Sequence, residues 1–285
     1  MLEPQQAPSQ SSGLAMPAMP DLSDDEFARI ARRVLKTTGI VLKDHKRVLV
    51  KSRISKRLKE LGMDQFATYL DYLDTPDGEA ETIAFCNAIT TNLTSFFREE
   101  HHFEQMCQQL QQMDLKPDSR LRIWSAGCST GNEPYSIAMS LMSCSCAAKV
   151  ANKKILATDI DTAVLDTAAK GIYRENTRES VPEKYRHFLV EAGDEKHVRV
   201  AEPLRDLVAF RRLNLFDEWP FRGQFDFIFC RNVMIYFSKE NKEQLIDNFA
   251  NYLRPGGVLY VGHSETLMRS HPKLVAESRT AFRRV

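Results

Sequence analysis

Several features that define other protein classes are missing from this 285-residue sequence. No apolar run approaches the roughly 20 residues that a membrane-spanning helix requires. The net charge is +1, so the overall charge does not indicate binding to nucleic acid. The six cysteines form no CxxC pair, and no histidines stand at the spacing of a zinc site. We therefore expect no metal, reduced thiols, a cytoplasmic location and no insertion into a membrane.

What is present is typical of a globular protein of one or two domains. Hydrophobic residues make up 43% and charged residues 27% of the chain, which is an ordinary balance for a protein with an apolar core. Residues 1–20 are rich in Pro, Gln, Ser, Ala and Met, and they lack the basic start and apolar block of a signal peptide. We predict that these residues form a disordered tail.

Two parts follow the tail. Residues 21–88 have only helical patterns, and the first helix begins with a capping box at Ser23–Glu26 and is followed by Gly39. From Leu121 onwards apolar strands alternate with helices, which predicts a parallel sheet covered on both faces. The expected strands are 121–125, 154–158, 208–213, 225–230 and 257–262, and the expected helices are 132–146, 161–170 and 239–253. Three short extended runs within 187–213 predict a small antiparallel insertion.

The turn after the first of these strands indicates a cofactor. Leu121 to Pro134 reads as a strand, a small-residue turn and a helix start, and such a turn lets a ligand approach the backbone and its free N–H groups. The turn has Gly127 and Gly131 without a central glycine, and no Gly-Lys-Ser/Thr follows, which argues against a dinucleotide and a Walker A loop. Asp159 ends the second strand, where a carboxylate can bind ribose. S-adenosylmethionine, a nucleoside cofactor without phosphates, fits these residues; an ordinary strand–turn–helix is the alternative.

With these residues in place, the sequence resembles the CheR-type chemoreceptor glutamate methyltransferases. The resemblance runs from about Leu22 to the end. It rests on five stretches: Thr91 to Arg98, Ala126 to Pro134, Ala157 to Asp161, Phe225 to Phe237 and Leu253 to Glu265. The first and fourth stretches are specific to the family, whereas many methyltransferases share the second and third. The resemblance implies an all-helical, receptor-docking N-terminal domain over 21–88. It also implies a Rossmann-like class I S-adenosylmethionine-dependent methyltransferase domain over 89–285.

The resemblance also implies the reaction and the site. The methyl group would pass to glutamate side chains in the cytoplasmic helical domain of chemoreceptors, giving methyl esters and S-adenosylhomocysteine, and we expect the enzyme to be a monomer. Ten residues would contact the cofactor: Asn92, Thr94, Arg98, Gly127, Glu133, Asp159, Asn214, Leu215, Arg231 and Asn232. Glu133 suits the amino group of the methionine part, and Asp159 suits the ribose. Arg231 and Asn232 follow the fourth strand, at the sheet edge where open α/β sheets bind ligands; a surface charge and a helix cap are the alternatives.

Methyl transfer to a glutamate requires no general base, because a carboxyl group with a pKa near ~4.3 is already ionised at neutral pH. Catalysis then depends on positioning and on the exclusion of water. Arg98 and Tyr236 are the candidates for orienting the acceptor carboxylate, Arg98 because a guanidinium can hold a carboxylate through two parallel hydrogen bonds. Core packing is the alternative for Tyr236, whose neighbours Ile235 and Phe237 are apolar.

A basic helix is predicted over residues 43–61, which contain eight Lys or Arg against two acidic residues. Lys46, Arg53 and Arg57 share one stripe beside the apolar one. We expect these three residues to dock an acidic receptor helix, and a solvated basic face is the alternative. The 187–213 insertion resembles the family's β-subdomain, which in some members binds the receptor's C-terminal tail peptide as an extra strand. The sequence does not say whether this chain binds such a tail.

Two other functions fit less well. The basic helix favours a nucleic-acid methyltransferase, but Cys230 to Val233, at the fourth strand, lacks the Pro-Pro-aromatic motif by which base-amine methyltransferases resemble one another. No aromatic residues alternate with the basic run either, so we expect no nucleic-acid partner. A non-catalytic S-adenosylmethionine-binding module stays open, because cofactor residues alone do not distinguish such a module from an enzyme.

Overall fold

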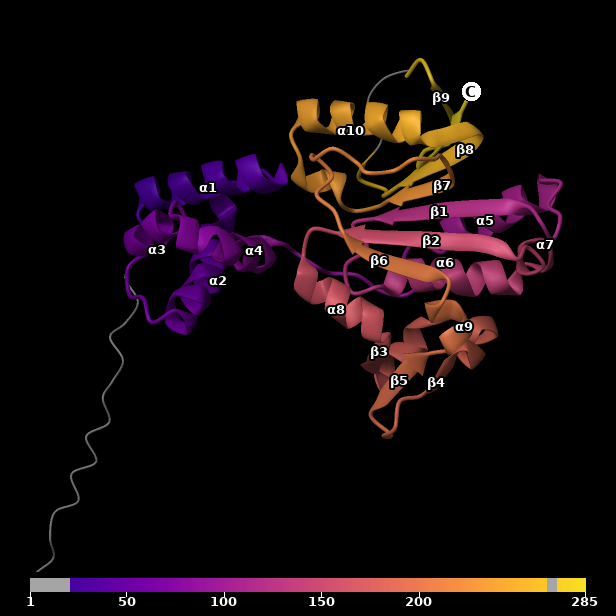
Figure 1. The fold of residues 1–285 in the computed structure, drawn as a ribbon, viewed down its shortest axis with the longest axis horizontal. Helices are drawn as coiled ribbons and strands as arrows, with labels where there is room; N and C mark the ends of the chain where they lie inside the picture. Colours follow the sequence, from indigo (N-terminus) through magenta and orange to yellow (C-terminus); the bar gives the residue numbers. More distant parts are fainter. Residues whose placement is uncertain (1–20, 266–270) are drawn as a thin grey trace, which may run out of the picture.

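The computed structural model describes residues 21–265 and 271–285, and the tail predicted over 1–20 lies outside the described residues. Four helices form the first part: α1 (Asp24–Thr38), α2 (Arg47–Glu60), α3 (Phe66–Tyr72) and α4 (Glu79–Ile89) (Figure 1). The capping box at Ser23–Glu26 is present, and Gly39 follows α1 with a left-handed φ of 71°. Apolar side chains of the four helices, among them Ile30, Ile54 and Phe85, bury a common core, which confirms the predicted helical patterns.

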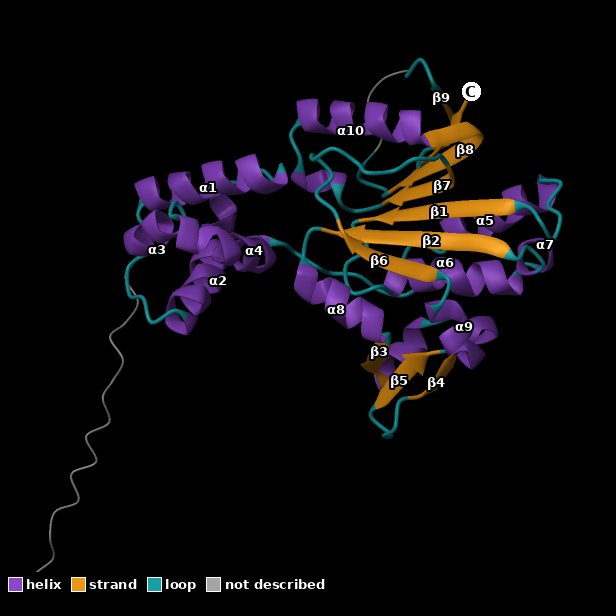
Figure 2. Cartoon of the chain, viewed as in Figure 1, coloured by secondary structure: helices purple, strands orange, loops and turns teal. Residues whose placement is uncertain are grey.

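Seven strands form the central sheet, in the order β6-β2-β1-β7-β8-β10-β9 (Figure 2). Their bounds are β1 (Arg120–Ala126), β2 (Asn152–Asp159), β6 (Val208–Arg212), β7 (Phe225–Cys230), β8 (Leu253–Val261), β9 (Leu274–Ser278) and β10 (Ala281–Arg284). The pairings from β6 to β8 are parallel, and those of β10 with β8 and β9 are antiparallel. The predicted parallel sheet is thus confirmed, with an antiparallel pair added at one edge.

Helices cover both faces of this sheet (Figure 1). On one face lie α5 (His101–Gln112), α6 (Asn132–Ser143) and α8 (Thr162–Lys170), and on the other lies α10 (Lys239–Tyr252); two short helices are α7 (Ser145–Ala148) and α9 (Glu202–Arg205). Met106 and Ile137 belong to the core on the first face, while Leu245 and Phe249 belong to the core on the second. The helix after β1 and the helix after β7 therefore pack on opposite faces, and such a reversal opens a crevice at the carboxyl ends of the strands.

The small antiparallel sheet is present, but its strands differ from the predicted ones. It contains β3 (Ile172–Arg174), β5 (His197–Val200) and β4 (Leu189–Glu191), in that order. The third run instead forms most of β6, which pairs with β2 at the edge of the central sheet and confirms the strand predicted over 208–213. The boundaries 187–213 are therefore wrong at both ends, since the small sheet begins earlier and ends before β6. A strand as short as β3 is too brief for an alternating pattern to be recognised.

The helical part is fastened to the sheet part by hydrogen bonds. The Val41 N–H donates to the Tyr236 carbonyl at 2.9 Å, and Asn87 Nδ2 donates to Thr162 Oγ1 at 3.0 Å. The two parts thus meet at the loops that follow β2 and β7.

None of the helices in the described residues combines the length and apolarity that crossing a membrane requires.

The end of α4 decides the shape of the next segment. This helix ends at Ile89. Arg53 of α2 donates from Nη1 to the carbonyls of residues 88, 89 and 90, at 3.2, 2.9 and 2.6 Å. Because these carbonyls are satisfied by a side chain, the helix stops there and Thr90 turns to an extended conformation. The extended chain that follows is then available to line the site.

Candidate functional site

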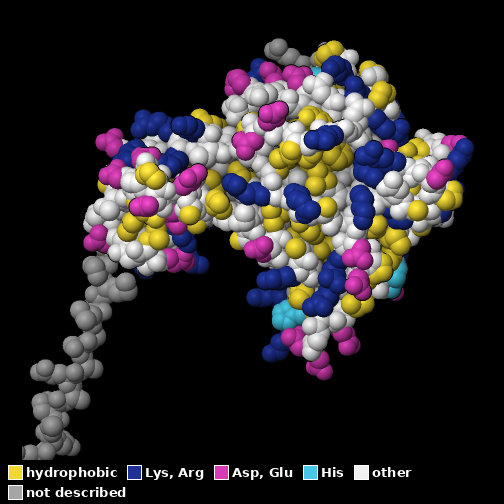
Figure 3. All heavy atoms as spheres, in the orientation of Figure 1, with side chains coloured by type: hydrophobic (Ala, Val, Ile, Leu, Met, Phe, Trp, Pro, Cys, Tyr) yellow, Lys and Arg dark blue, Asp and Glu magenta, His cyan; other side chains and the backbone are white. Residues whose placement is uncertain are grey.

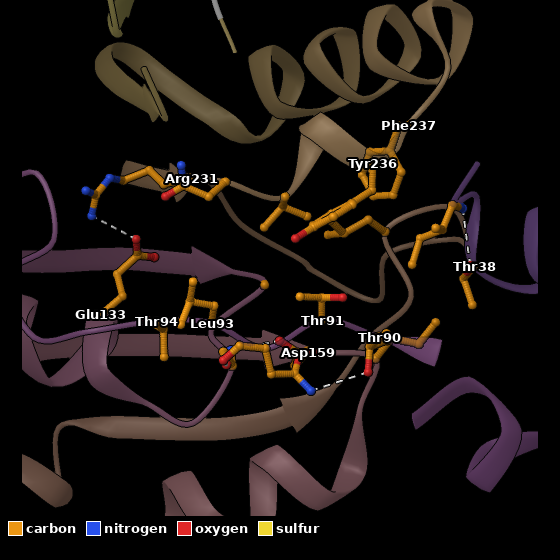
Figure 4. A pocket seen from close by; sticks show the side chains of 18 of the residues that line it. Thr38, Thr90, Thr91, Leu93, Thr94, Glu133, Asp159, Arg231, Tyr236 and Phe237 are labelled. Carbon is orange, nitrogen blue, oxygen red and sulfur yellow. Dashed lines mark hydrogen bonds and ion pairs between the residues drawn. The ribbon is translucent and has the colours of Figure 1, made fainter. Parts of the chain in front are cut away.

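One pocket collects the ends of four strands and the extended segment after α4. It lies at the carboxyl ends of β1, β2, β6 and β7, and Figure 4 shows side chains from these elements directed into it. Eleven residues predicted for cofactor or acceptor line this pocket: Asn92, Thr94, Arg98, Gly127, Glu133, Asp159, Asn214, Leu215, Arg231, Asn232 and Tyr236. The fold thus gathers the complete predicted cofactor and catalytic set around one cavity.

The turn after β1 is closed onto β2. Gly127 has a φ of 80°, and a Cβ atom there would lie 2.3 Å from Val233 Cγ2, so glycine is needed for the loops after β1 and β7 to approach each other. The N–H groups of Gly127 and Cys128 donate to the Thr158 carbonyl at 2.8 and 2.9 Å. The N–H of Ser129 donates to the carboxylate at the end of β2. The expectation of free N–H groups is therefore wrong for these three residues, which is consistent with a cofactor that has no phosphates.

Asp159 ends β2 with a carboxylate that is almost completely buried. Its Oδ2 accepts the Ser129 N–H at 2.8 Å, and its Oδ1 accepts the Asp161 N–H at 3.0 Å. Burial raises the pKa of this carboxyl, and the two N–H groups partly oppose that rise. Because each carboxylate oxygen can accept more than one hydrogen bond, Asp159 keeps capacity for hydroxyl groups in the pocket.

A buried ion cluster forms another end of the pocket (Figure 4). The side chain of Arg231 is 2% exposed, and its Nη1 lies 3.0 Å from Glu133 Oε2 while its Nη2 lies 3.5 Å from Glu99 Oε2. Glu133 also accepts a hydrogen bond from Ser125 Oγ at 2.7 Å. Burial raises the pKa of Glu133, although Arg231 and Ser125 oppose the rise. Burial also disfavours the ionised form of Glu99, but Arg231 and His263 hold its pKa below the usual value.

Asp161, just after β2, fastens the extended segment. Its buried carboxylate accepts hydrogen bonds from Thr90 Oγ1 at 2.8 Å and from Asn92 Nδ2 at 2.7 Å. The same carboxylate caps α8 through the N–H groups of residues 163 and 164. Ser129 Oγ donates to the Asn92 carbonyl at 3.0 Å. The Asn92 amide is thus engaged in holding the pocket wall.

Arg98 and Tyr236 face the same cavity from different elements. Arg98 is half-buried, and its Nη1 donates to the Leu93 carbonyl at 3.1 Å. A guanidinium has several N–H donors, so this bond leaves others for an acceptor. Tyr236 ends the 3₁₀ turn Met234–Tyr236 and directs its side chain into the pocket (Figure 4). The core-packing alternative for Tyr236 therefore does not apply.

The loop after β7 is held by Glu265. The Glu265 carboxylate accepts the N–H groups of Asn232 at 2.7 Å, Gly262 at 2.6 Å and Ile235 at 3.2 Å. Asn232 has a φ of 60°, a left-handed conformation that asparagine tolerates better than most residues. Burial raises the pKa of Glu265, while the N–H groups favour its ionised form. Glu265 thus keeps Asn232 at the pocket without lining the pocket itself.

The predicted docking residues on α2 have mostly internal partners. Arg53 caps the end of α4, and Arg57 donates to both carboxylate oxygens of Glu81 at 2.9 and 2.7 Å. Glu81 is buried and also accepts a hydrogen bond from Tyr69. Within the described residues Lys46 alone of the three predicted residues has no such partner. Arg53 and Arg57 are thus engaged within the protein; Lys46 and Arg53 line a second, smaller cavity beside the pocket, and Arg57 lines neither.

Three acidic residues that shape the site, Glu99, Asp161 and Glu265, are not predicted from the sequence. Asp161 and Glu265 lie inside the family-like stretches, so those stretches contained a usable signal. Glu99 directly follows Arg98, but nothing in the local sequence indicates that its side chain reaches Arg231 across the fold. Its φ of 55° is uncommon for a residue other than glycine and is visible only in the structure.

Comparison with known proteins places both parts of the chain in one family. The chain matches the description "CheR methyltransferase, all-alpha domain" over residues 25–90 and "CheR methyltransferase, SAM binding domain" over residues 92–282. It is 42% identical over 262 residues to Chemotaxis protein methyltransferase 2 of Pseudomonas aeruginosa, covering 90% of this chain and 92% of that protein. It is 44% identical over 248 residues to Chemotaxis protein methyltransferase of Salmonella typhimurium, covering 86% and 84%. For the Escherichia coli protein of that name, identity is 40% over 265 residues, covering 92% and 91%.

Proposed function

The chain belongs to the CheR methyltransferase family, and we propose that it transfers the methyl group of S-adenosylmethionine to glutamate side chains of chemoreceptors. The products are glutamate methyl esters and S-adenosylhomocysteine. The observation that carries this proposal is the pocket at the carboxyl edge of the sheet, lined by Glu133, Asp159, Arg98 and Tyr236. Since the acceptor is the cytoplasmic domain of the receptor, the enzyme acts in the cytoplasm, and it acts as a monomer.

The residues of the pocket fit S-adenosylmethionine, which supplies the methyl group on a cationic sulfur. The cluster of Glu133, Glu99, Arg231 and His263 has one net negative charge when both glutamates are ionised and His263 is neutral, which matches the ammonium group of a methionine tail. Asp159 has acceptor capacity for ribose hydroxyls. The turn at Gly127 does not offer the N–H groups that a pyrophosphate would require. The chemistry of these residues therefore favours an adenosyl cofactor with an amino acid tail.

Glu99 has a distinct role in this proposal. If Arg231 contacted only Glu133, the pair would be neutral and would attract an ammonium group weakly. Glu99 shares the charge of Arg231, because its Oε2 lies 3.5 Å from Nη2 of the same guanidinium. We therefore assign Glu99 as a positioning residue that leaves Glu133 available to the cofactor.

The other lining residues complete the binding role. Leu215 is almost buried and offers an apolar surface for the adenine, while Thr94 and Asn232 close the pocket from the segments after α4 and β7. Asn214 Nδ2 donates to the Thr37 carbonyl at 3.0 Å, so this residue holds the helical part against the pocket. The role of Asn214 is thus to position the helical part at the pocket.

Arg98 and Tyr236 orient the acceptor. A glutamate carboxylate is already a nucleophile at neutral pH, so the enzyme has to hold it in line with the methyl group and keep water out. The Arg98 guanidinium can hold one carboxylate through two hydrogen bonds, and the Tyr236 hydroxyl can donate another. A docked receptor helix would cover the open side of the pocket.

The small sheet is the candidate site for a receptor tail peptide. Within the described residues its outer strands β3 and β4 each pair with β5 only, so each has an edge to which a peptide can add as a further strand. A receptor fragment with its C-terminal tail should then be methylated at a lower KM than the same fragment without the tail. Equal KM values would leave the small sheet without this role.

The proposed reaction is tested with S-adenosylmethionine labelled in the methyl group and an array of purified receptor cytoplasmic fragments. We expect base-labile label on glutamate side chains of one or more fragments. Label on RNA would indicate a nucleic-acid methyltransferase. Cofactor binding without transfer to any fragment would indicate a non-catalytic binding module.

A further inference from the structure

A small notch lies beside the pocket, between the start of α2 and the loop after β7. Leu42, Leu49, Val50 and Ile89 provide its apolar lining. Ile40, Thr91 and Tyr236 line both the notch and the larger pocket, so the two cavities are adjacent. A group seated in the notch therefore lies next to Tyr236, which we have assigned to the acceptor.

The surroundings of the notch are unusually apolar for a protein surface. Leu49 is 38% exposed at the notch, and Leu93 on the pocket wall is 82% exposed. Val41, which lines the notch, and Ile235, which precedes Tyr236, are also exposed hydrophobic residues. Exposed apolar side chains that gather around a functional cavity indicate a binding surface.

The charges near the notch indicate what kind of partner fits it. The guanidinium of Arg53 is engaged by the carbonyls at the end of α4, so its stem rather than its charge is offered to the notch. Lys46 also lines the notch, and within the part of the chain that the structure describes it forms no ion pair. An apolar notch beside a single free cation fits an amphipathic segment that has acidic residues next to apolar ones.

We propose that the notch receives an apolar side chain of the receptor helix, one helical turn away from the glutamate that is methylated. This proposal rests on the proposed function and adds which feature of the receptor helix the enzyme recognises beside the glutamate. Residues three or four positions apart on a helix have Cβ atoms about 5–6 Å from each other. A receptor helix that places its glutamate at Arg98 and Tyr236 can thus place the apolar residue three or four positions away in the notch, because Tyr236 lines both cavities. Lys46 then meets an acidic residue on the same helix.

The test uses the full chain and a receptor fragment already shown to be methylated by the wild-type protein. Leu49→Ser should raise the KM for this fragment by about tenfold, because the change removes apolar surface against which the receptor side chain packs. The affinity for S-adenosylhomocysteine should not change. Val48→Ser is the matched control, since Val48 is 79% exposed on the same helix and does not line the notch.

A second set of variants in the receptor fragment identifies the side chain that occupies the notch. Apolar residues three or four positions from the methylated glutamate are replaced by serine, one at a time. One of these changes should raise the KM of the wild-type enzyme and have little further effect on Leu49→Ser, which is the signature of a direct contact. If Leu49→Ser leaves the KM unchanged, or if the two losses simply add, the notch is not the receptor subsite, although the methyltransferase activity itself would stand. Failure of the wild-type protein to methylate any fragment would instead overturn the proposed function.

Discussion

Two walls of the site, one at the pocket and one at the adjoining notch, are built in opposite ways. The wall formed by the sheet has buried charges, with Arg231 between Glu133 and Glu99 and with Asp159 nearby. The wall formed by the helical part, at α2, belongs to the adjoining notch, to which it offers apolar side chains, and its Arg53 and Arg57 are satisfied internally. Figure 3 shows that Lys and Arg side chains do lie on the surface of the helical part, so basic residues are present there even though this wall is apolar.

This difference indicates how the two substrates are recognised. Charges in a buried site act at close range and are weakly screened, which suits a small cationic cofactor. A receptor helix is large, and contact with an apolar notch gives it a defined register that surface charge alone would not. The affinity for the cofactor should thus be sensitive to changes of charge in the sheet wall. The affinity for the receptor should be sensitive to changes of side-chain shape in the helical wall.

The largest effect is expected for stability, from Arg57→Met in the helical part. This change leaves the buried Glu81 without its main partner, so we expect the free energy of unfolding to fall by about 3 kcal/mol in a urea titration. Lys59→Met, on the exposed side of α2, should have little effect. If Arg57→Met were as stable as the wild type and raised the KM for the receptor, the arginine would dock the acceptor and the comparison between the walls would fail.

Among changes in the sheet wall, Glu133→Gln should weaken cofactor binding most. The change removes the carboxylate proposed for the ammonium group and leaves Arg231 without its nearer partner. We expect the Kd for S-adenosylhomocysteine, measured by calorimetry, to rise about 100-fold, or ~2.7 kcal/mol. Ser125→Ala, which removes only the hydrogen bond to Glu133, should cost far less. A Kd within threefold of wild type for Glu133→Gln would show that the ammonium group is bound elsewhere.

Glu99→Gln should cost about tenfold in the same Kd, because Arg231 would then neutralise Glu133 more completely. Methylthioadenosine lacks the amino acid part, and its affinity should be unchanged. Glu100→Gln is the matched control, since Glu100 contacts Lys184 at 3.7 Å rather than Arg231. If the affinities for both ligands fell equally, Glu99 would have a general role in folding and would not act by balancing the charge of Arg231.

The smallest effect is expected from mild acidification. Burial raises the pKa of Glu133 and Asp159 in the free protein, so these carboxyls take up protons at a higher pH than ordinary ones. A protonated carboxyl does not attract an ammonium group, so the affinity for S-adenosylhomocysteine should fall as the pH is lowered, starting above the ordinary carboxyl range. Calorimetry in two buffers of different ionisation enthalpy should detect proton release on binding. Glu133→Gln should flatten this pH dependence; an unchanged slope would exclude Glu133 as its source.

The cofactor residues could be predicted because their positions follow from local patterns. Gly127 and Arg231 directly follow a strand and Asp159 ends one, and parallel strands bring their carboxyl ends to one edge of a sheet. The order of the strands was not needed for this prediction. The capping box at Ser23–Glu26 and the stop at Gly39 were equally local, since a helix end depends on only a few neighbouring residues.

The roles of long side chains could not be predicted in the same way. Arg53 and Arg57 share a stripe with Lys46 on α2, and the helical pattern does not say that two of these three find partners on α4 or beside it. Glu99 reaches Arg231 only because the segment after α4 passes over the end of β7. An arginine can place its guanidinium several ångströms from its backbone, so its partner depends on which element packs opposite.

By itself the sequence determined the order of helices and strands, the cofactor edge of the sheet and the family, because these depend on short-range periodicity and on motifs at strand ends. Only the tertiary structure decided that Arg53 and Arg57 of the basic helix are satisfied from within, that the third run of the predicted 187–213 insertion belongs to the central sheet alone, and that Glu99 completes the charge around Arg231. Each of these depends on contacts between residues far apart in the chain, which the free energy of packing selects and local sequence does not encode.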